Sequence, residues 1–411
     1  MILPVIKKST FFDFLNRYTD YDFESFLARS KEDIDYINWH DYCLPMNYGD
    51  ESKEYNAVRS ACALFDASPV KKYKISGSDA GVFLDAVMTR QISKTKSMRV
   101  IYATLCNESG MLLDDGLLYK FAEDDYLLMI SEIDHDEHFA KVSNRFEYLK
   151  IYEVTPSLSG LAVQGPRSCA VLDCMGFGAI ENLKPFEIKN FEFDYGKVIV
   201  ARVGFTADLG YELWFEPALD STIEHGICKA EISLGIQIAG YGLNVLNALR
   251  IEGGFIVPGW ETAQTFEDDE YERTPAELGI SWTVDLDRKD DFIGKAALLK
   301  EKNPRFKTIG LAIDEKCDIQ DGIELYSVVN GKECQVGTLP SLAWSYGLDC
   351  ALSLASIKFE FFGNSDPSKG GLEYYLNIAG ERIACRILKL PFVQFDRYRQ
   401  TPASISSFQE F

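Results

Sequence analysis

Histidine is scarce in this chain, with four residues among 411. His135 and His138 lie in the acidic segment Asp-His-Asp-Glu-His, which we interpret as a solvated helix face rather than a metal site. Catalysis by a Ser-His-Asp triad or by zinc is therefore poorly supported, and we expect no metal centre.

Several other signals are missing as well. The ten cysteines form no Cys-x-x-Cys pair, and residues 1–8 lack the apolar core of a signal peptide. We therefore expect reduced thiols in a cytoplasmic protein. No segment approaches the roughly 18 apolar residues of a membrane helix. No Gly-x-Gly-x-x-Gly or Walker-type loop is present, which leaves a bound dinucleotide or ATP unsupported.

Positive charge is in deficit: 63 acidic residues face 42 lysines and arginines, for a formal net charge of −21. We therefore expect neither a nucleic-acid partner nor an anionic membrane partner. A small anionic ligand remains open, because a local pocket can be basic inside an acidic protein. Hydrophobic residues make up 46% of the chain, which is typical of a globular protein with room for about two or three domains.

The segment Asn107–Tyr119 predicts a β-hairpin. Its Asn-Glu-Ser-Gly start is typical of a turn, and Gly110 suits a position with positive φ. Apolar residues resume on both sides, over 99–105 and 112–119, and residues 126–130 predict a third strand next to them.

Two adjacent carboxylates, Asp114 and Asp115, lie on the returning strand of this hairpin. Successive strand residues face opposite sides, so one of the two must face the core, where a carboxylate needs a partner or a role. A turn with two solvated acids explains this segment alone equally well.

Other segments predict the rest of the architecture. We expect helices over 132–149 and 242–252, the second one ended by Gly253-Gly254, and a solvated acidic loop over 266–272. From Pro304 the texture changes to short alternating strands separated by glycines, which predicts a small antiparallel barrel up to about residue 395.

Eight groups of residues, taken in chain order, resemble the glycine-cleavage T-protein (aminomethyltransferase) superfamily over about residues 41–395. They are Pro45-Met46 with Glu54, Ala57-Val-Arg59 and Leu64–Ser68; Gly77–Ala80; Tyr102 with Gly110–Asp115; Val163–Pro166; Arg202–Glu212; Gly242 with Ala248–Glu252; Thr274-Pro275 with Gly279; and Asp291–Ala296.

The resemblance implies an α+β fold, a three-domain cloverleaf of the aminomethyltransferase type around a tetrahydrofolate site, with a C-terminal antiparallel β-barrel domain. We accordingly expect an N-terminal extension over 1–40 and a folate-binding core of two interleaved α+β domains over 41–303. The barrel domain is expected over 304–411.

The resemblance also implies roles for particular residues. Asp114 is matched to the aspartate that meets the reactive folate nitrogens, although a one-residue slip would exchange it with Asp115. Tyr102 is a candidate acid, and both it and Asp114 are taken as catalytic. The implied folate-binding residues are Glu212 for the pterin edge, Phe205 for stacking in place of the usual tyrosine, Asp115, Arg250 and Arg399.

Two departures from the family pattern bear on the reaction. The usual Thr-Gly-Glu-Asp-Gly is Thr206-Ala-Asp-Leu-Gly210 here, and the usual Gly-Leu-Gly-Ala-Arg-Asp is Gly242-Leu-Asn-Val-Leu-Asn247. The long N-terminal extension is a further departure, and the patterns of Gly242–Glu252 and Asp114–Tyr119 are similar to those of folate-dependent demethylases. On these grounds we expect a tetrahydrofolate-dependent, demethylase-like methyltransferase that acts on a small S-, N- or O-methylated substrate. The alternatives are an aminomethyltransferase that forms 5,10-methylene-tetrahydrofolate, or a non-catalytic folate-binding regulatory or assembly protein. The sequence names no donor and leaves a homodimer open.

Overall fold

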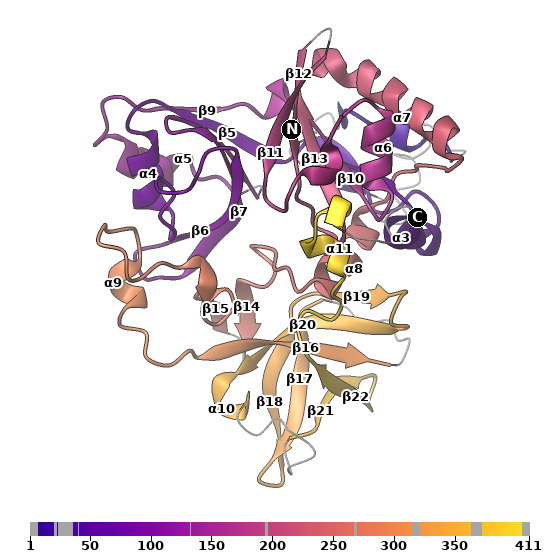
Figure 1. The fold of residues 1–411 in the computed structure, drawn as a ribbon. Coiled ribbons are helices and arrows are strands. Elements are labelled where there is room, and N and C mark those ends of the chain that lie inside the picture. Colours follow the sequence, from indigo (N-terminus) through magenta and orange to yellow (C-terminus); the bar gives the residue numbers. More distant parts are fainter. Residues whose placement is uncertain are drawn as a thin grey trace, which may run out of the picture.

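The computed structural model describes residues 7–19, 23, 36–39, 41–131, 133–193, 196–266, 269–314, 321–362 and 372–404. Two five-stranded sheets and a seven-stranded sheet form three lobes, with the short helices α8 and α11 near their centre (Figure 1). In these ranges no helix combines the length and the apolar character needed to cross a membrane.

The first lobe contains the predicted hairpin, and its sheet has the order β6-β7-β8-β5-β9. β6 and β7 pair antiparallel, Gly110 takes a φ of 79° in their turn, and the hairpin prediction is confirmed. Helices α4 and α5 pack on one face of this sheet. The bounds are Lys71–Ser76 (β5), Ala80–Val87 (α4), Arg99–Cys106 (β6), Leu112–Ala122 (β7), Asp125–Ile130 (β8), Asp136–Ser143 (α5) and Lys150–Glu153 (β9).

The helix predicted over 132–149 is wrong in extent. The helix α5 covers Asp136–Ser143, and the chain beyond it turns back so that β9 can pair with β5. Helical spacing alone did not reveal this turn, because the pairing that favours it comes from a strand more than seventy residues earlier in the chain.

The second lobe is an antiparallel sheet of order β11-β12-β13-β10-β4, with α6 and α7 packed on one face. Its strand β4 precedes the whole first lobe in sequence, so the two lobes are interleaved. The apolar cluster of Tyr119, Leu127, Met129, Ala201 and Trp214 joins the two sheets. The bounds are Ala63–Asp66 (β4), Ser159–Gln164 (β10), Ser168–Cys174 (α6), Ile188–Phe193 (β11), Gly196–Ala201 (β12), Gly210–Phe215 (β13) and Asp220–Leu234 (α7).

The third lobe confirms the predicted antiparallel barrel. Six of its strands close because β16 pairs with both β20 and β22, while β19 joins the outer side of β20. The bounds are Phe306–Ile313 (β16), Ile323–Val329 (β17), Lys332–Leu339 (β18), Leu342–Ser345 (β19), Cys350–Lys358 (β20), Phe359–Phe362 (α10), Tyr374–Ile378 (β21) and Glu381–Leu388 (β22). The domain limits at residues 40 and 303 remain predictions.

Shorter elements connect the lobes. Part of the predicted N-terminal extension lies outside the described residues; within the described part, Phe11 and Leu15 pack into the second lobe. Of residues 266–272, predicted as a loop, Asp269–Glu272 form a strand instead, which pairs antiparallel with Ala263–Phe266. The bounds are Lys7–Lys8 (β1), Phe12–Leu15 (α1), Tyr36–Trp39 (β2), Tyr42–Pro45 (β3), Glu51–Ser60 (α3), Leu243–Glu252 (α8), Ala263–Phe266 (β14), Asp269–Glu272 (β15), Lys295–Leu298 (α9) and Asp396–Arg399 (α11).

A buried ion network joins α3 and α8 to the second lobe and to α11, which follows the barrel. Arg59 of α3 donates to the carboxylate of Glu252 at the end of α8, and Arg59 Nη1 lies 3.3 Å from Asp208 Oδ2 in the loop before β13. Asp208 also accepts from Arg397 of α11, at 2.7 Å from Nη2. Glu252 and Asp208 are fully or almost fully buried, so each carboxylate depends on these cations.

We predict that Arg59→Leu lowers the free energy of unfolding by about 3 kcal/mol or more, because it leaves two buried carboxylates with less compensation. Urea-induced unfolding measures this change. The control is Arg386→Leu, which breaks an exposed pair with Asp314 and is expected to cost less than about 1 kcal/mol. Equal losses in the two variants would contradict the structural role of the network.

Candidate active site

The two adjacent carboxylates of β7 face opposite sides of the first sheet. Asp114 is fully buried and lies on the face covered by α4 and α5. Its Oδ2 accepts from Ser131 Oγ at 2.8 Å and lies 2.7 Å from His135 Nε2, while its Oδ1 accepts from the backbone N–H of Asp115 at 2.8 Å. Asp114 is therefore enclosed by protein groups.

Asp115 lies on the other face, which it shares with Leu117 and Tyr119 of the cluster between the two sheets. Its Oδ2 accepts from the hydroxyl of Tyr102. Burial raises the pKa of Asp115 to about 7; the hydrogen bond from Tyr102 opposes this rise, and the charge of Asp114 adds to it. A carboxyl group with this pKa can both take up and release a proton near neutral pH.

Tyr102 completes this side of the site. Its ring stacks on Trp282 at a centroid distance of 5.5 Å, and the Trp282 side chain is largely exposed. Burial, and then the neighbouring Asp115, raise the pKa of Tyr102 well above its ordinary value. The phenol therefore keeps its proton and acts as a fixed donor to Asp115.

Glu212 faces the first sheet from β13 of the second. Its Oε2 accepts from the hydroxyl of Tyr119 at 2.7 Å, and that hydroxyl accepts from Trp214 Nε1 at 3.1 Å. Burial raises the pKa of Glu212, while hydrogen bonds from Tyr119 and Trp214 lower it. Tyr119 follows Asp115 by four residues on the same face of β7. Its hydrogen bond to Glu212 therefore connects the strand that bears Asp115 with the second sheet.

Two further predicted residues, Phe205 and Arg250, contact Phe255. Phe205 stacks on Phe255 at 5.5 Å, and the ring of Tyr398, next to the exposed Arg399, lies 6.4 Å from Phe255. Arg250 donates from Nη1 to the carbonyl of Phe255 at 3.0 Å and to Glu261 at 2.7 Å. Its buried Nη2 has no hydrogen-bond partner among the described residues.

The loop that carries Phe205 packs tightly on the end of α8. Ala207 takes a φ of 55°, where the family pattern has glycine, and this left-handed conformation costs a residue with a Cβ about 1 kcal/mol. A Cβ on Gly253 would lie 2.7 Å from the Cβ of Ala207, so glycine is required at 253.

The structure thus brings Tyr102 and Asp115 together, connects them to Glu212, and sets Asp114 apart behind the strand. Three residues around the site, His135, Tyr119 and Trp214, were not predicted from the sequence; His135 is 3% exposed rather than solvated. The last two could have been found, since Tyr119 and Trp214 share strand faces with Asp115 and Glu212. Within the described ranges, no group of three or more His, Cys, Asp or Glu could hold a metal.

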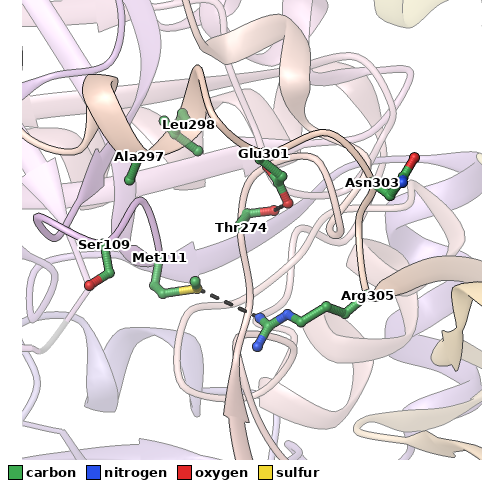
Figure 2. A pocket seen from close by; sticks show the side chains of 8 residues that line it. All are labelled: Ser109, Met111, Thr274, Ala297, Leu298, Glu301, Asn303 and Arg305. Atoms are coloured by element: carbon green, nitrogen blue, oxygen red, sulfur yellow. Dashed lines mark hydrogen bonds between the residues drawn. The ribbon is translucent and has the colours of Figure 1, made fainter.

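A separate hollow of about 150 Å³ lies at the tip of the β6–β7 hairpin (Figure 2). Its polar groups are paired within the protein: Thr274 donates to Glu301 at 2.8 Å, and Arg305 is held by the buried Glu277. None of the predicted site residues lines it. The lining residues are Ser109, Met111, Thr274, Ala297, Leu298, Glu301, Asn303 and Arg305.

Comparisons with known proteins give a consistent result. The family described as the GCVT N-terminal domain matches residues 33–288. An aminomethyltransferase of Clostridium botulinum (strain Kyoto / Type A2) is 30% identical over 353 residues, covering 84% of this chain and 90% of the relative. An aminomethyltransferase of Bacillus subtilis (strain 168) is 29% identical over 364 residues, covering 87% and 94%.

A solved structure extends the likeness to the fold. The glycine cleavage system aminomethyltransferase T from Bartonella henselae matches with a TM-score of 0.76 at 21% identity, covering 96% of this chain and 99% of that chain. The predicted fold of the aminomethyltransferase type is thereby confirmed.

We predict that Asp115→Asn stabilises the protein more at pH 8 than at pH 5. The folded pKa of Asp115, about 7, lies above the ordinary value of about 3.9. Its contribution to stability is therefore full below about pH 3.9, and it is lost progressively as the pH rises from there to about 7. The neutral amide of the variant does not undergo this loss. The increase in the free energy of unfolding caused by Asp115→Asn should therefore be larger at pH 8 than at pH 5 by about 1 kcal/mol or more, as measured by urea unfolding.

Asp124→Asn, at an exposed turn after β7, is the control and should show the same small effect at both pH values. An equal effect of Asp115→Asn at the two pH values would mean that Asp115 is not held in the protonated form by the fold.

Proposed function

The chain belongs to the glycine-cleavage T-protein family, a family of folate-dependent transferases that use tetrahydrofolate, and we propose that it transfers the methylene carbon of an aminomethyl group to tetrahydrofolate. The product would be 5,10-methylene-tetrahydrofolate. The two folate nitrogens each form a bond to the carbon, the bonds from that carbon to its carrier and to the amine break, and the two protons lost by the folate nitrogens leave on the free carrier and on ammonia. The observation that carries the proposal is the pair of Tyr102 and Asp115, with the raised pKa of Asp115, on the sheet face turned toward Glu212.

The relatives favour aminomethyl transfer over the demethylase-like reaction expected from the sequence, since they are named aminomethyltransferases and match most of this chain. The demethylase expectation rested partly on two departures from the family pattern. In the structure three residues of those departures make contacts within the protein. Asp208 pairs with Arg59 and Arg397, Asn244 donates to Glu51 at 2.6 Å, and Asn247 accepts from Arg250 at 2.8 Å.

The residues present fit tetrahydrofolate. Tetrahydrofolate, when bound, supplies two nitrogens that can carry a carbon at the methylene level of oxidation. A carboxylate such as Glu212, with one oxygen already held by Tyr119, suits an edge that offers parallel N–H donors. The exposed ring of Phe205 offers a stacking face. The exposed Arg399 would provide positive charge for an acidic tail. Arg250 is paired with Glu261, but its buried Nη2 has no hydrogen-bond partner among the described residues and would serve as a donor to the ligand.

We assign the acid–base role to Asp115 in place of Asp114. Asp115 would take up the proton released when the new carbon–nitrogen bonds form and would return it to the departing amine. Tyr102 keeps the carboxylate oriented through its O–H. The apolar cluster between the sheets limits the access of water to this face, which protects the one-carbon unit from hydrolysis.

The function is tested by incubating the protein with tetrahydrofolate and a panel of donors: an aminomethylated thiol, and sulfonium, methylamine and methoxy compounds. We expect 5,10-methylene-tetrahydrofolate from the first donor. Formation of 5-methyl-tetrahydrofolate from a methyl donor would favour the demethylase reaction, and no product from any donor would favour the non-catalytic alternative.

In the same assay, Asp115→Asn should lower turnover about 100-fold or more, because the amide cannot carry the proton. Tetrahydrofolate affinity should change only a few-fold. Asp124→Asn serves again as the surface control. Turnover close to that of the unmodified protein in Asp115→Asn would remove this residue from the chemistry.

Glu212→Ala should instead weaken tetrahydrofolate binding by about 10-fold or more, because it removes a charged acceptor from the pterin edge. Fluorescence titration measures the dissociation constant. Glu216→Ala, at an exposed position just after β13, is the matched control. Equal affinity in the two variants would place the pterin elsewhere.

A further inference from the structure

The face of β7 that is covered by α4 and α5, which we call the closed face, holds a buried pair of polar side chains that the proposed reaction does not use. His135 is 3% exposed and Asp114 is fully buried, and their side chains meet at 2.7 Å. The ring of His135 also lies 6.0 Å from that of Phe139. A histidine placed on a carboxylate in an apolar core needs an explanation, because two desolvated polar groups are costly there.

A continuous path of contacts connects His135 to the proposed active site. His135 Nε2 meets Oδ2 of Asp114, and Oδ1 of the same carboxylate accepts the backbone N–H of Asp115 at 2.8 Å. The orientation of Asp114 therefore acts on the main chain of Asp115. The charge of Asp114 acts on the Asp115 carboxyl as well, where it adds to the effect of burial, the largest cause of the raised pKa.

We propose that His135 is a positioning residue for the active site: it holds Asp114 on the closed face of β7, and Asp114 in turn fixes the main chain of Asp115 and the charge beside it. This inference rests on the proposed function for the importance of Asp115. The contact between His135 and Asp114 can be tested without an activity assay, because it lies on the face of β7 opposite Asp115.

Other charged groups around His135 have partners of their own. Asp134 lies 3.6 Å from Lys71 of β5, and Asp136 accepts from Tyr73 of the same strand at 2.8 Å. His138, on the next turn of α5, has a pKa lowered by burial and then by the nearby charges of His135 and Lys141. Asp114 is thus the charged group in direct contact with the His135 ring nitrogen.

The test compares His135→Leu, Asp114→Asn and the double variant, using protein labelled with ¹³C at the aspartate carboxyl carbon. The Asp115 signal is assigned by its loss in Asp115→Asn, and its titration midpoint is followed by NMR. Removing the charge of Asp114 should lower this midpoint by about one pH unit. His135→Leu removes the group that stabilises that charge and should lower the midpoint in the same direction.

The double variant decides whether the two residues act together. We expect His135→Leu to produce no further shift in the Asp114→Asn background, because its effect passes through Asp114. In a plot of kcat/KM against pH, the acid limb should move by the same amount as the NMR midpoint. The dissociation constant of tetrahydrofolate should stay unchanged. The matched control is His138→Leu, whose ring nitrogen Nε2 has no partner among the described residues and whose removal should leave the midpoint in place.

The proposal is overturned if folded His135→Leu titrates like the unmodified protein, if its shift persists in the double variant, or if His138→Leu produces the same shift. If His135→Leu does not fold, Ser131→Ala removes the other side-chain donor to Asp114 and tests the same path. An unmodified protein that makes no 5,10-methylene-tetrahydrofolate would refute the proposed function, whereas the NMR titration would still decide the role of His135.

Discussion

The buried carboxylate of Glu252 connects α3 and α8 with the barrel and with the segment that follows it. One of its oxygens accepts from Tyr55 and Ser345, the other accepts from Arg59, and its backbone carbonyl accepts from Phe392 and Val393. These partners come from α3, from the strand attached to the barrel and from the segment after the barrel. A buried charge with so many donors fixes their relative positions, because losing one donor leaves a desolvated charge uncompensated. The two sheets that bear Asp115 and Glu212 meet separately, through the apolar cluster around Tyr119 and Trp214.

The site follows from a simple property of β7. Adjacent residues of a strand face opposite sides, so the neighbouring carboxylates experience different surroundings. Asp114 is enclosed with Ser131 and His135, whereas Asp115 shares the face of Tyr119, through which the first sheet contacts Glu212. In our account, one carboxylate carries the proton and the other sets its position and its charge environment. Two roles of this kind require no histidine or metal at the reacting atoms.

Local patterns in the sequence predicted much of the fold. Turn residues and alternation identified the β6–β7 hairpin and the strands of the barrel, because these are local features, whereas the pairings of β16 with β20 and β22 that close the barrel join distant segments. The short extent of α5 was not predictable in this way, since β9 pairs with a distant strand. Alternation also showed that Asp114 and Asp115 must diverge, but it could not say which face meets the second lobe. His135 looked solvated beside so many acids; only the fold shows that its ring turns inward to Asp114.

The central claim is that the face of β7 bearing Asp115, together with Glu212 of β13, forms the tetrahydrofolate site. A crystal structure of the chain with bound tetrahydrofolate tests it most directly. Our account predicts the pterin within hydrogen-bond distance of the Glu212 carboxylate, with its reactive nitrogens toward Asp115 and Asp114 still enclosed by His135. A pterin bound in the hollow beside Thr274 and Glu301, or in contact with Asp114 on the opposite face of β7, would contradict the account.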